Sequence, residues 1–537
     1  MSTHVISYDI GTTGIKTCLF EISEEIKLIA STTEGYALYV LENGGVEQEP
    51  EEWWLAMQNS TRRLLEESQF EPHRVKGISF CAQMQGVVLT DHEGYSVRRA
   101  MSYMDNRAGA ELEAVMHHGI KIAGVNLFKL IKSLRLTGAV SASVKDPVWK
   151  YKWVENNEPE IFNRIYKWLD VKEFLICKCT DAFVMTEDSA FATLLYDTRK
   201  NHRRFSSELC KMMGVKESHL PKVIKSSDIA GTLTEKAANA LGLAIGTPVF
   251  GGGGDASLIG VGAGAVETGA THIYLGTSGW VSTVVDRQIL DIKNMIASII
   301  GSDSGRYNYF AELETAGKCL EWVRDHLALD EIDIYIEKKQ IHESREALFK
   351  SLYEYMIEAI KNVPAGSHGV IFTPWLHGNR CPFEDPNARG MFFNISLDTG
   401  KTELIHAVLE GICYHLRWQL ESQEEKIKTS KAIRLVGGGA LAPLTCQILA
   451  DILGREIETV DNPQNAGAMG AAVLVAIGLG IKKSVVDTAS LIKSNQVYKP
   501  NPDHKGTYDR YFDAFKALYR DNKQTFKILN ASHNSKH

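Results

Sequence analysis

The sequence predicts an α/β fold with two similar domains. Three observations predict this class: the length of the chain, a hairpin with a glycine loop that occurs twice, and helical segments that alternate with strand-like ones. The 537 residues exceed what one domain usually contains, which is about 100 to 200 residues. The second hairpin starts half a chain after the first, so the simplest account is two domains that each begin with a hairpin.

The first hairpin is predicted at the start of the sequence. Residues 4–10 are apolar and β-rich, the turn GTTG follows at residues 11–14, and IKTCLFEI resumes the strand pattern. Glycines lack a Cβ atom, so backbone N–H groups in such a turn can converge on a phosphate, and threonine hydroxyl groups add donors. A plain hairpin turn is the alternative. Lys16 follows Ile15 rather than a glycine, which argues against a P-loop fold.

The second hairpin, THIYLGTSGWVSTVV at residues 271–285, repeats this arrangement around GTSG. Two copies half a chain apart favour phosphate binding over two unrelated turns. The copies differ two residues before the first glycine, where the first has Asp9 and the second has Tyr274. A single carboxylate beside a phosphate loop suits Mg²⁺, which usually binds one or two carboxylates plus substrate phosphates. Asp9 is therefore the candidate magnesium residue, with an ordinary turn residue as the alternative.

A run of four glycines, residues 251–254, precedes Asp255 and a helix of small residues. This places the carboxylate at the predicted N-cap of the helix, and a plain N-cap is the alternative role. The missing side chains leave room for a ligand at a strand-to-helix corner. The helix N-terminus should keep Asp255 ionised at neutral pH. In phosphoryl transfer such a carboxylate orients the attacking hydroxyl group and takes its proton late.

A third glycine cluster, LVGGGA at residues 435–440, ends a strand and begins a helix that contains Pro443 near its start. The bare backbone can admit a flat purine. The cluster also fits G-x-G-x-x-A of the dinucleotide fingerprint, with Glu456 and Glu458 about 20 residues further on, so a nicotinamide enzyme is the rival interpretation. That rival leaves the paired loops and Asp255 unexplained.

Helical patterns between these motifs include PEEWWLAMQNSTRRLLEES, DPVWKYKWVENNEPEIF and KTELIHAVLEGICYHLRWQLES, and they alternate with the strand-like KGISFCA, HIYLGT and AIRLVGG. Gly246 and Pro248 interrupt helical patterning, so we expect one domain over residues 1–246 and another over residues 247–537. The segment from about Asp503 to Phe526 is predicted to be an amphipathic helix that packs on the core.

Composition excludes several classes of partner. The net charge is -7 and no long basic run occurs, which argues against nucleic acid. The first residues do not resemble a signal peptide, and no apolar run reaches the roughly 20 residues that span a membrane. The nine cysteines are scattered, as expected for reduced thiols. We therefore expect a cytoplasmic protein with no membrane association.

These motifs resemble those of the FGGY carbohydrate kinases, which are built from two ribonuclease H-like domains of the actin and Hsp70 ATPase type. The resemblance covers almost the full length, through DIGTTGIKTCLF, YLGTSGW, LVGGGALAPLTCQILAD and GMFFNISLDTGKTELIHAVLEGICYHL. It implies a catalytic cleft flanked by the two domains, ATP as co-substrate with Mg²⁺, and a small sugar as acceptor. It leaves a homodimer open.

The resemblance also implies roles for individual residues. Asp255 matches the catalytic base and Asp9 the residue that serves the magnesium-nucleotide. The nucleotide-binding residues that it implies are Gly11, Thr12, Thr13, Lys16, Gly276, Thr277, Gly317, Gly438, Gly439 and Ala440. The sugar-binding residues that it implies are Gln83, Met84, Gln85, Tyr103, Asp105, Arg107 and Asp255, with a structural ion pair as the alternative for Asp105 and Arg107.

Within the family, VEQEPEEWW, SFCAQMQGVVLTDHEG and YMDNRAGAE are most similar to xylulokinases. Xylulokinases usually have His at position 85, Trp at position 103 and Asn at position 256, whereas this chain has Gln85, Tyr103 and Ala256. A pentulose, D-xylulose first, is the expected substrate, with D-xylulose 5-phosphate as product. Another ketose, a polyol or a sugar acid is an alternative acceptor, and a non-catalytic actin-type ATPase is the alternative function on the same fold.

Overall fold

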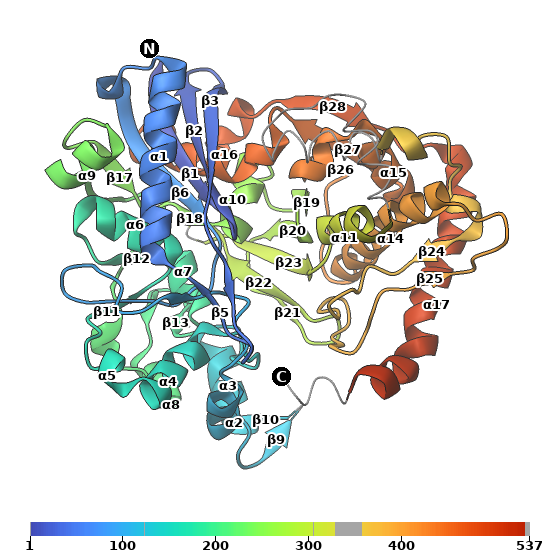
Figure 1. Cartoon of the computed structure of the whole chain (residues 1–537), viewed down its shortest axis with the longest axis horizontal. Coiled ribbons are helices and arrows are strands. Elements are labelled where there is room, and N and C mark those ends of the chain that lie inside the picture. Colours follow the sequence, from blue (N-terminus) through green and yellow to red (C-terminus); the bar gives the residue numbers. More distant parts are fainter. Residues whose placement is uncertain (1, 123, 304, 328–356, 532–537) are drawn as a thin grey trace.

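The computed structural model describes residues 2–122, 124–303, 305–327 and 357–531. Two mixed β-sheets form the two halves of the molecule, and helices cover them (Figure 1). This arrangement confirms the predicted α/β class with two similar halves. The boundary predicted at residue 246 remains a prediction, and the two short strands that follow it still pair with the first sheet.

The first sheet has the strand order β16-β17-β6-β1-β2-β3, with β18 beside the end of β6. Its strands are β1 (Thr3–Ile10), β2 (Gly14–Ile22), β3 (Ile26–Gly35), β6 (Val75–Ala82), β16 (Ile229–Thr232), β17 (Pro248–Phe250) and β18 (Gly253–Gly254). The first three strands are antiparallel, while β6, β17 and β18 run parallel to β1. The predicted first hairpin is therefore confirmed.

The second sheet has the order β21-β22-β23-β20-β19-β26-β27-β28. Its strands are β19 (Thr271–Leu275), β20 (Gly279–Val285), β21 (Leu290–Asp291), β22 (Ile296–Ile300), β23 (Tyr307–Leu313), β26 (Ala432–Val436), β27 (Glu456–Val460) and β28 (Ser494–Tyr498). The hairpin β19-β20 continues into antiparallel β23, and β26 lies parallel to β19. This core repeats β1, β2, β3 and β6, so the sequence repeat reflects a repeated sheet.

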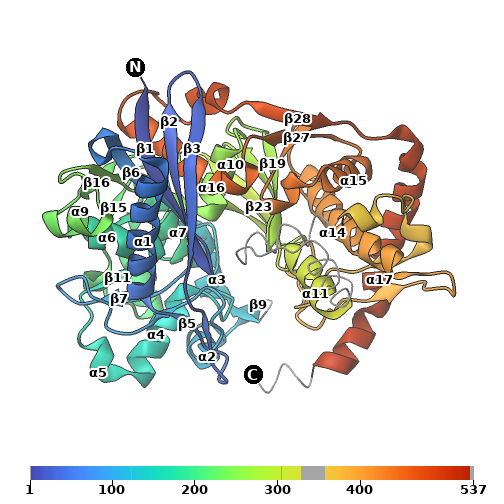
Figure 2. The same cartoon turned by 45° about the horizontal axis from the view of Figure 1, so that its top comes forward.

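Two helices of small residues, α10 (Asp255–Gly262) and α16 (Ala466–Gly478), lie between the sheets (Figures 1 and 2). They approach so closely that a Cβ atom on Gly470 would lie 2.3 Å from the carbonyl oxygen of Leu258. The Ser7 hydroxyl of β1 donates to the carbonyl of Ala468 at 2.7 Å, although 461 positions separate them. Glycine and alanine therefore let both helices sit at the junction of the two halves.

The remaining helices cover the outer faces, and α1 lies across β2 and β3 (Figure 2). In the first half they are α1 (Pro50–Ser68), α2 (Gly109–Met116), α3 (Leu127–Leu136), α4 (Pro147–Asn157), α5 (Pro159–Phe162), α6 (Val171–Thr180), α7 (Glu187–Ala192), α8 (Ser207–Met213) and α9 (Glu235–Leu241). In the second half they are α11 (Gly317–Leu327), α14 (Lys401–Glu424), α15 (Pro443–Leu453) and α17 (Lys505–Asn530).

The last helix, α17, packs through Phe512, Phe515 and Phe526 onto the core that α14 and α15 also line, which confirms the packing role predicted for the tail. The segment predicted as one helix after Asp146 is divided into α4 and α5 at Glu158, whose backbone is not helical. Among the helices in the described ranges, none is long and apolar enough to cross a membrane.

Short strands complete the connections. They are β4 (Tyr39–Val40), β5 (Val46–Gln48), β7 (Val88–Thr90), β8 (Ala100–Met101), β9 (Lys121–Ile122), β10 (Val125–Asn126), β11 (Lys167–Leu169), β12 (Val184–Thr186), β13 (Tyr196–Asp197), β14 (Arg204–Phe205), β15 (Lys222–Ile224), β24 (Ile371–Phe372) and β25 (Phe392–Phe393). Of these, β5 pairs with β4 and β8 in a small sheet that lies under the first glycine loop.

Candidate active site

The predicted site residues of the first half meet at one edge of the first sheet. Strands β1, β6 and β18 are parallel and end side by side, since Ile10 and Gly254 both pair with Ala82. The carboxyl ends of parallel strands are where open α/β sheets bind ligands. The first glycine loop, the segment from Gln83 and the helix that begins at Asp255 all start from this edge.

The first glycine loop is a tight turn in which the Gly11 amide donates to the Gly14 carbonyl at 2.9 Å. The Tyr36 hydroxyl donates to both of these glycine carbonyls, at 2.5 and 3.1 Å. Thr12 is half-buried and Thr13 is exposed, so the tip of the loop faces open space. Its position between two strands is the one that the sequence predicted.

Asp9 lies on β1, opposite Lys16 on β2 and beside Cys81 on β6. Burial raises the pKa of Asp9, and the Lys16 ammonium and a Cys81 hydrogen bond only partly oppose the rise. The Lys16 ammonium itself donates to the Gln464 carbonyl at 2.9 Å. A Cβ atom on Gly467, at the start of α16, would lie 3.0 Å from the Asp9 Oδ2 atom, so a glycine there keeps the space beside the carboxylate open.

The second glycine loop is also a tight turn, closed by the Gly276 amide on the Ser278 carbonyl at 3.0 Å. The start of α11 lies directly on it: the Gly317 amide donates to the Gly276 carbonyl at 2.9 Å, and the Lys318 amide to the Thr277 carbonyl at 3.1 Å. A Cβ atom on Gly317 would approach the Gly276 oxygen to 2.4 Å. The structure thus places Gly317 directly against the second glycine loop, whose residues the resemblance assigns to the nucleotide together with Gly317.

The third glycine cluster follows β26 and packs on the residue before the second loop. Gly437 has a φ of +93°, and Cβ atoms on Gly437 and Gly439 would collide with Leu275 at 2.6 and 2.4 Å. No heavy atom of the described chain lies within 4 Å of the Cβ position of Gly438, so this glycine faces open space. Pro443 is the first residue of α15, as predicted.

Asp255 differs from its prediction in two ways. It is the first residue of α10, and Gly254 is the N-cap, one position from the predicted arrangement. Burial raises the pKa of Asp255 to about 7, and the negative charges of Asp9 and Glu312 add to the rise despite a 2.7 Å hydrogen bond from the Ala256 amide. The expectation that the helix N-terminus keeps this carboxylate fully ionised at neutral pH is wrong, because desolvation outweighs the helix dipole.

A second carboxylate, which the sequence analysis missed, supports the start of α10. Asp188 accepts hydrogen bonds from the Gly254 amide at 2.7 Å and from the hydroxyls of Ser257 and Thr186 at 2.5 Å each. Burial alone would raise the pKa of Asp188, but the Lys172 ammonium and these hydrogen bonds outweigh it and hold the pKa below its usual value. Asp188 lies 66 positions from Gly254, so no local motif could have revealed it.

The segment that follows β6 lies at the same edge of the first sheet, close to the start of α10. Met84 lies against Gly254, where a Cβ atom would come within 2.1 Å of its sulfur. Gln85 has a φ of +64°, and Asp170 accepts hydrogen bonds from its amide and from the next amide, both at 2.9 Å. Gln83 is 7% exposed. The structure therefore places Met84 against Gly254, the residue before Asp255, while a sugar-binding role for Gln83, Met84 and Gln85 remains a prediction.

The other three residues predicted to bind the sugar are Tyr103, Asp105 and Arg107, and they lie in different surroundings. Tyr103 is 37% exposed, and its hydroxyl lies 3.3 Å from the Thr12 hydroxyl at the first loop. Asp105 is fully buried, and both of its oxygens accept hydrogen bonds from Arg107 at 2.6 to 3.2 Å. Arg107 also donates to Glu47 at 2.6 Å. This is the structural ion pair weighed as the alternative for Asp105 and Arg107, and their contact with a sugar remains a prediction.

The second half contributes two glutamates near the site, and neither was predicted from the sequence. The Glu312 charge acts on Asp255, and the charges of Glu312 and Glu314 act on Tyr103. Arg380 forms an ion pair with Glu312 at 3.3 Å, and Lys145 of the first half forms one with Glu314 at 3.6 Å. Glu312 and Glu314 lie in the segment AELETAG, in which only Gly317 was predicted to be a site residue.

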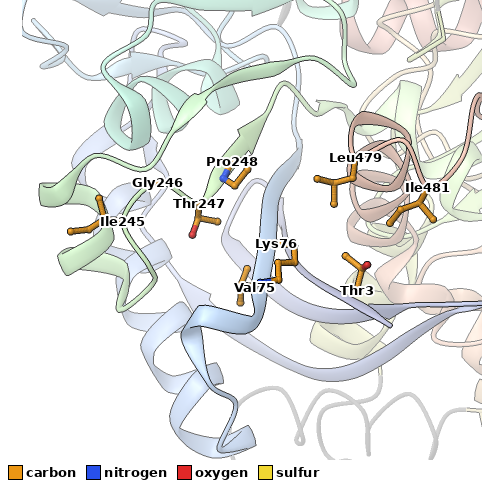
Figure 3. Close-up of a pocket in the computed structure, with 9 residues that line it drawn as sticks. All are labelled: Thr3, Val75, Lys76, Ile245, Gly246, Thr247, Pro248, Leu479 and Ile481. Atoms are coloured by element: carbon orange, nitrogen blue, oxygen red, sulfur yellow. The ribbon is translucent and has the colours of Figure 1, made fainter. Parts of the chain in front are cut away.

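A separate pocket lies at the opposite edge of the first sheet, where β1, β6 and β17 begin (Figure 3). It has a volume of about 530 Å³, and the end of α16 closes one side. Its lining residues are Thr3, Val75, Lys76, Ile245, Gly246, Thr247, Pro248, Leu479 and Ile481. This lining contains no carboxylate and no glycine loop, so the pocket lacks the groups that phosphoryl transfer needs.

Comparison with known families agrees with this geometry. Residues 4–262 match the N-terminal domain of the FGGY family of carbohydrate kinases, and residues 272–479 match its C-terminal domain. The chain belongs to the FGGY family. The predicted resemblance is thereby confirmed, and the family is one of ATP-using sugar kinases rather than nicotinamide enzymes.

Individual relatives of this FGGY kinase differ in substrate. It is 27% identical over 521 residues to xylulose kinase of Staphylococcus epidermidis, covering 97% of each chain. It is 26% identical over 521 residues to gluconokinase of Bacillus subtilis, covering 97% of this chain and 96% of that one. These two values are too similar to choose between the two substrates.

Solved structures show the same fold. Xylulose kinase from Lactobacillus acidophilus superposes with a TM-score of 0.83 at 24% identity, covering 98% of this chain and all of that one. Glycerol kinase from Plasmodium falciparum, solved with ADP, gives a TM-score of 0.76 at 21% identity, covering 96% and 98% of the two chains. The two-domain, actin-like architecture implied by the resemblance is therefore confirmed.

Proposed function

We propose that this FGGY kinase transfers the γ-phosphoryl group of ATP to a hydroxyl group of a small neutral sugar, with the pentulose D-xylulose as the first candidate and D-xylulose 5-phosphate as its product. The observation that carries the proposal is the position of Asp255. Its carboxylate lies at the edge of the first sheet from which the first glycine loop starts, its pKa is near 7, and Met84 of the segment Gln83 to Gln85 lies against the preceding residue, Gly254.

In this proposal Asp255 acts as the general base. A pKa near the working pH lets a carboxylate accept a proton and yet be partly ionised before the reaction. Asp255 would orient the attacking hydroxyl group and accept its proton as the new oxygen–phosphorus bond forms and the bond between the γ-phosphorus and the bridging oxygen breaks. Asp188 would keep the first turn of α10, and so this carboxylate, in place.

The phosphates would lie between the two glycine loops. Amide groups of Thr12 and Thr13 and hydroxyl groups of Thr12 and Thr277 would be the donors at the loop tips, and the third cluster would receive adenosine where Gly438 faces open space. Closure of the two halves would exclude water and limit ATP hydrolysis without sugar.

The residues present fit a magnesium ion at Asp9. Burial raises the pKa of its carboxyl group, and its Oδ2 atom lies beside Gly467, which has no side chain to fill the space there. Within the described residues no three potential ligands cluster, and Mg²⁺ commonly takes only one or two carboxylates together with phosphate oxygens. Bound with ATP, the ion would withdraw negative charge from the β- and γ-phosphate oxygens.

Electrostatics favour a neutral acceptor over a sugar acid. Asp9, Asp255, Glu312 and Glu314 bring four carboxylates to this corner. The nearby cations are Arg380 and Lys145, which are paired with the two glutamates, and Lys16, which lies beside Asp9 and donates to the Gln464 carbonyl. A carboxylate on the substrate would add another negative charge next to Asp255, which costs free energy unless a free cation compensates. This argument supports a ketose or polyol, and D-xylulose follows from the resemblance.

The test is ADP release from Mg-ATP with a panel of neutral sugars and sugar acids. A sugar-dependent rate that Asp255→Asn abolishes is expected. A wild-type ATPase rate that no sugar changes would instead favour the non-catalytic actin-type ATPase, and a response to gluconate alone would refute the argument from charge.

A further inference from the structure

Gln48, the last residue of β5, links the first glycine loop to the segment that faces Asp255. Its amide nitrogen donates to the Thr12 carbonyl at 2.7 Å, and its amide oxygen accepts from the Gln83 amide nitrogen at 2.8 Å. Gln48 is 1% exposed and Gln83 is 7% exposed. This buried pair of side-chain amides has no part in the mechanism described so far.

The orientation of both amides follows from one backbone group. A carbonyl oxygen can only accept, so the nitrogen of Gln48 must face Thr12 and its oxygen must face Gln83. Gln83 must then turn its nitrogen toward Gln48. The remaining atom, Gln83 Oε1, is buried and accepts no hydrogen bond from any residue in the described part of the chain.

A buried oxygen of this kind nearly always has a donor. Gln83 comes directly after Ala82, the residue with which both Ile10 and Gly254 pair, and Met84 lies against Gly254 at the start of α10. The side chain that carries this oxygen therefore starts from the edge where the acceptor substrate would bind. Sugars present hydroxyl donors, whereas ATP presents mostly acceptor oxygens at its phosphates. The free oxygen therefore suits the sugar rather than the nucleotide.

We propose that Gln48 is a positioning residue that fixes the Gln83 amide as an acceptor for one sugar hydroxyl group and connects this contact to the backbone of the first phosphate loop. The inference rests on the proposed function, because it needs a sugar in this corner. It adds a residue that reaches the substrate only through another side chain. It also gives a route by which the sugar contact and the Thr12 carbonyl affect each other over two hydrogen bonds.

The test is a double-mutant cycle with Gln48→Leu, Gln83→Leu and both together, measured as kcat and KM for the sugar that gives the strongest ADP release. Each single variant should raise the sugar KM by about 10-fold, which is typical of one lost hydrogen bond in a buried site. The double variant should be no worse than Gln83→Leu, because Gln48 acts through Gln83. If the double variant instead raises the sugar KM by the product of the two single-variant effects, the inference is wrong.

Gln48→Met separates hydrogen bonding from packing, since methionine has nearly the same length and volume, but its thioether cannot donate to the Thr12 carbonyl and accepts only weakly from the Gln83 amide nitrogen. It should raise the sugar KM as much as Gln48→Leu does, with a far-ultraviolet circular dichroism spectrum like that of the wild type. Gln524→Leu, on the exposed face of α17, is the matched control and should leave the KM unchanged.

The outcomes distinguish the inference from the proposed function. Active wild-type protein with a Gln48→Met variant of unchanged sugar KM would refute the inference alone. Wild-type protein that binds ATP but releases no ADP with any sugar would refute the proposed function and this inference with it. A sugar KM that rises in both Gln48 variants, and does not rise further when Gln83 is also replaced, supports both.

Discussion

Replacement of Asp255 by Asn should remove catalysis and at the same time stabilise the protein. In the folded chain the pKa of Asp255 is raised from 3.8 to about 7, first by burial and then by the charges of Asp9 and Glu312. The folded state therefore holds the proton more tightly than the unfolded chain does. Ionising Asp255 penalises folding, and this penalty grows above about pH 4, is fully present above about pH 7, and is absent in more acidic solution.

The size of the effect follows from the shift. About three pKa units correspond to ~4 kcal/mol as an upper limit, and water entering the cleft reduces it. An unfolding entropy of ~2 cal/mol/K per residue converts this into a rise in Tm of at most about 4 °C for 537 residues. Asparagine keeps an oxygen that can accept from the Ala256 amide, so the start of α10 should not change.

The assay is a melting curve of the ligand-free wild type and Asp255→Asn at pH 8 and at pH 4.5, with ADP release measured in parallel. The variant should melt higher than the wild type at pH 8, nearly match it at pH 4.5, and lose about 100- to 10,000-fold in kcat. A variant that melts lower at pH 8, or whose difference from the wild type does not depend on pH, would refute the reasoning about the buried charge.

Three further predictions concern the site. The kcat/KM of the wild type should rise with pH, reach half its maximum near pH 7 and level off above about pH 8 as Asp255 ionises, and Glu312→Gln should shift this profile to lower pH by removing a like charge. Asp9→Asn should raise the Mg²⁺ concentration for half-maximal rate by about 10-fold or more, as measured by magnesium titration at fixed ATP. Gly317→Ala should raise the KM for ATP by about 10-fold, because the new Cβ atom would lie 2.4 Å from the Gly276 oxygen.

Each of these predictions has a contradicting result. If the pH profile of Glu312→Gln matches that of the wild type, the charge of Glu312 does not affect the pKa of Asp255. Wild-type magnesium dependence in Asp9→Asn would remove Asp9 from the metal site. Gly506→Ala on α17, where no described heavy atom lies within 4 Å of the new Cβ atom, is the control for the glycine substitution. If this control and Gly317→Ala behave alike, the collision at the second loop does not matter for ATP.

The sequence predicted the repeated core because its signals are local. Both hairpins combine a β-rich run with a glycine turn, and β1 pairs with β2, and β19 with β20, as expected. The helix of residues 50–68 was also predictable, since Pro50 and the two following glutamates mark its start. Residues within the motifs, from Asp9 to Asp255, could therefore be proposed as site residues without a structure.

Residues that act over long separations could not be found in this way. Asp188 meets Gly254 only when α7 packs against β18, and the Glu312 charge acts on Asp255 only when the two halves come together. The pKa of Asp255 could not be predicted from the sequence for the same reason. A helix N-terminus is visible in a sequence, whereas the burial that outweighs it depends on packing between Met84, α10 and the second half.

The most direct test of the proposed kinase is coupled ADP release from Mg-ATP with D-xylulose, L-xylulose, D-ribulose, L-ribulose, erythritol, glycerol and gluconate. The account predicts a strong response to one neutral sugar, D-xylulose first, and little or none to gluconate. ATP binding with no response to any neutral sugar would contradict it.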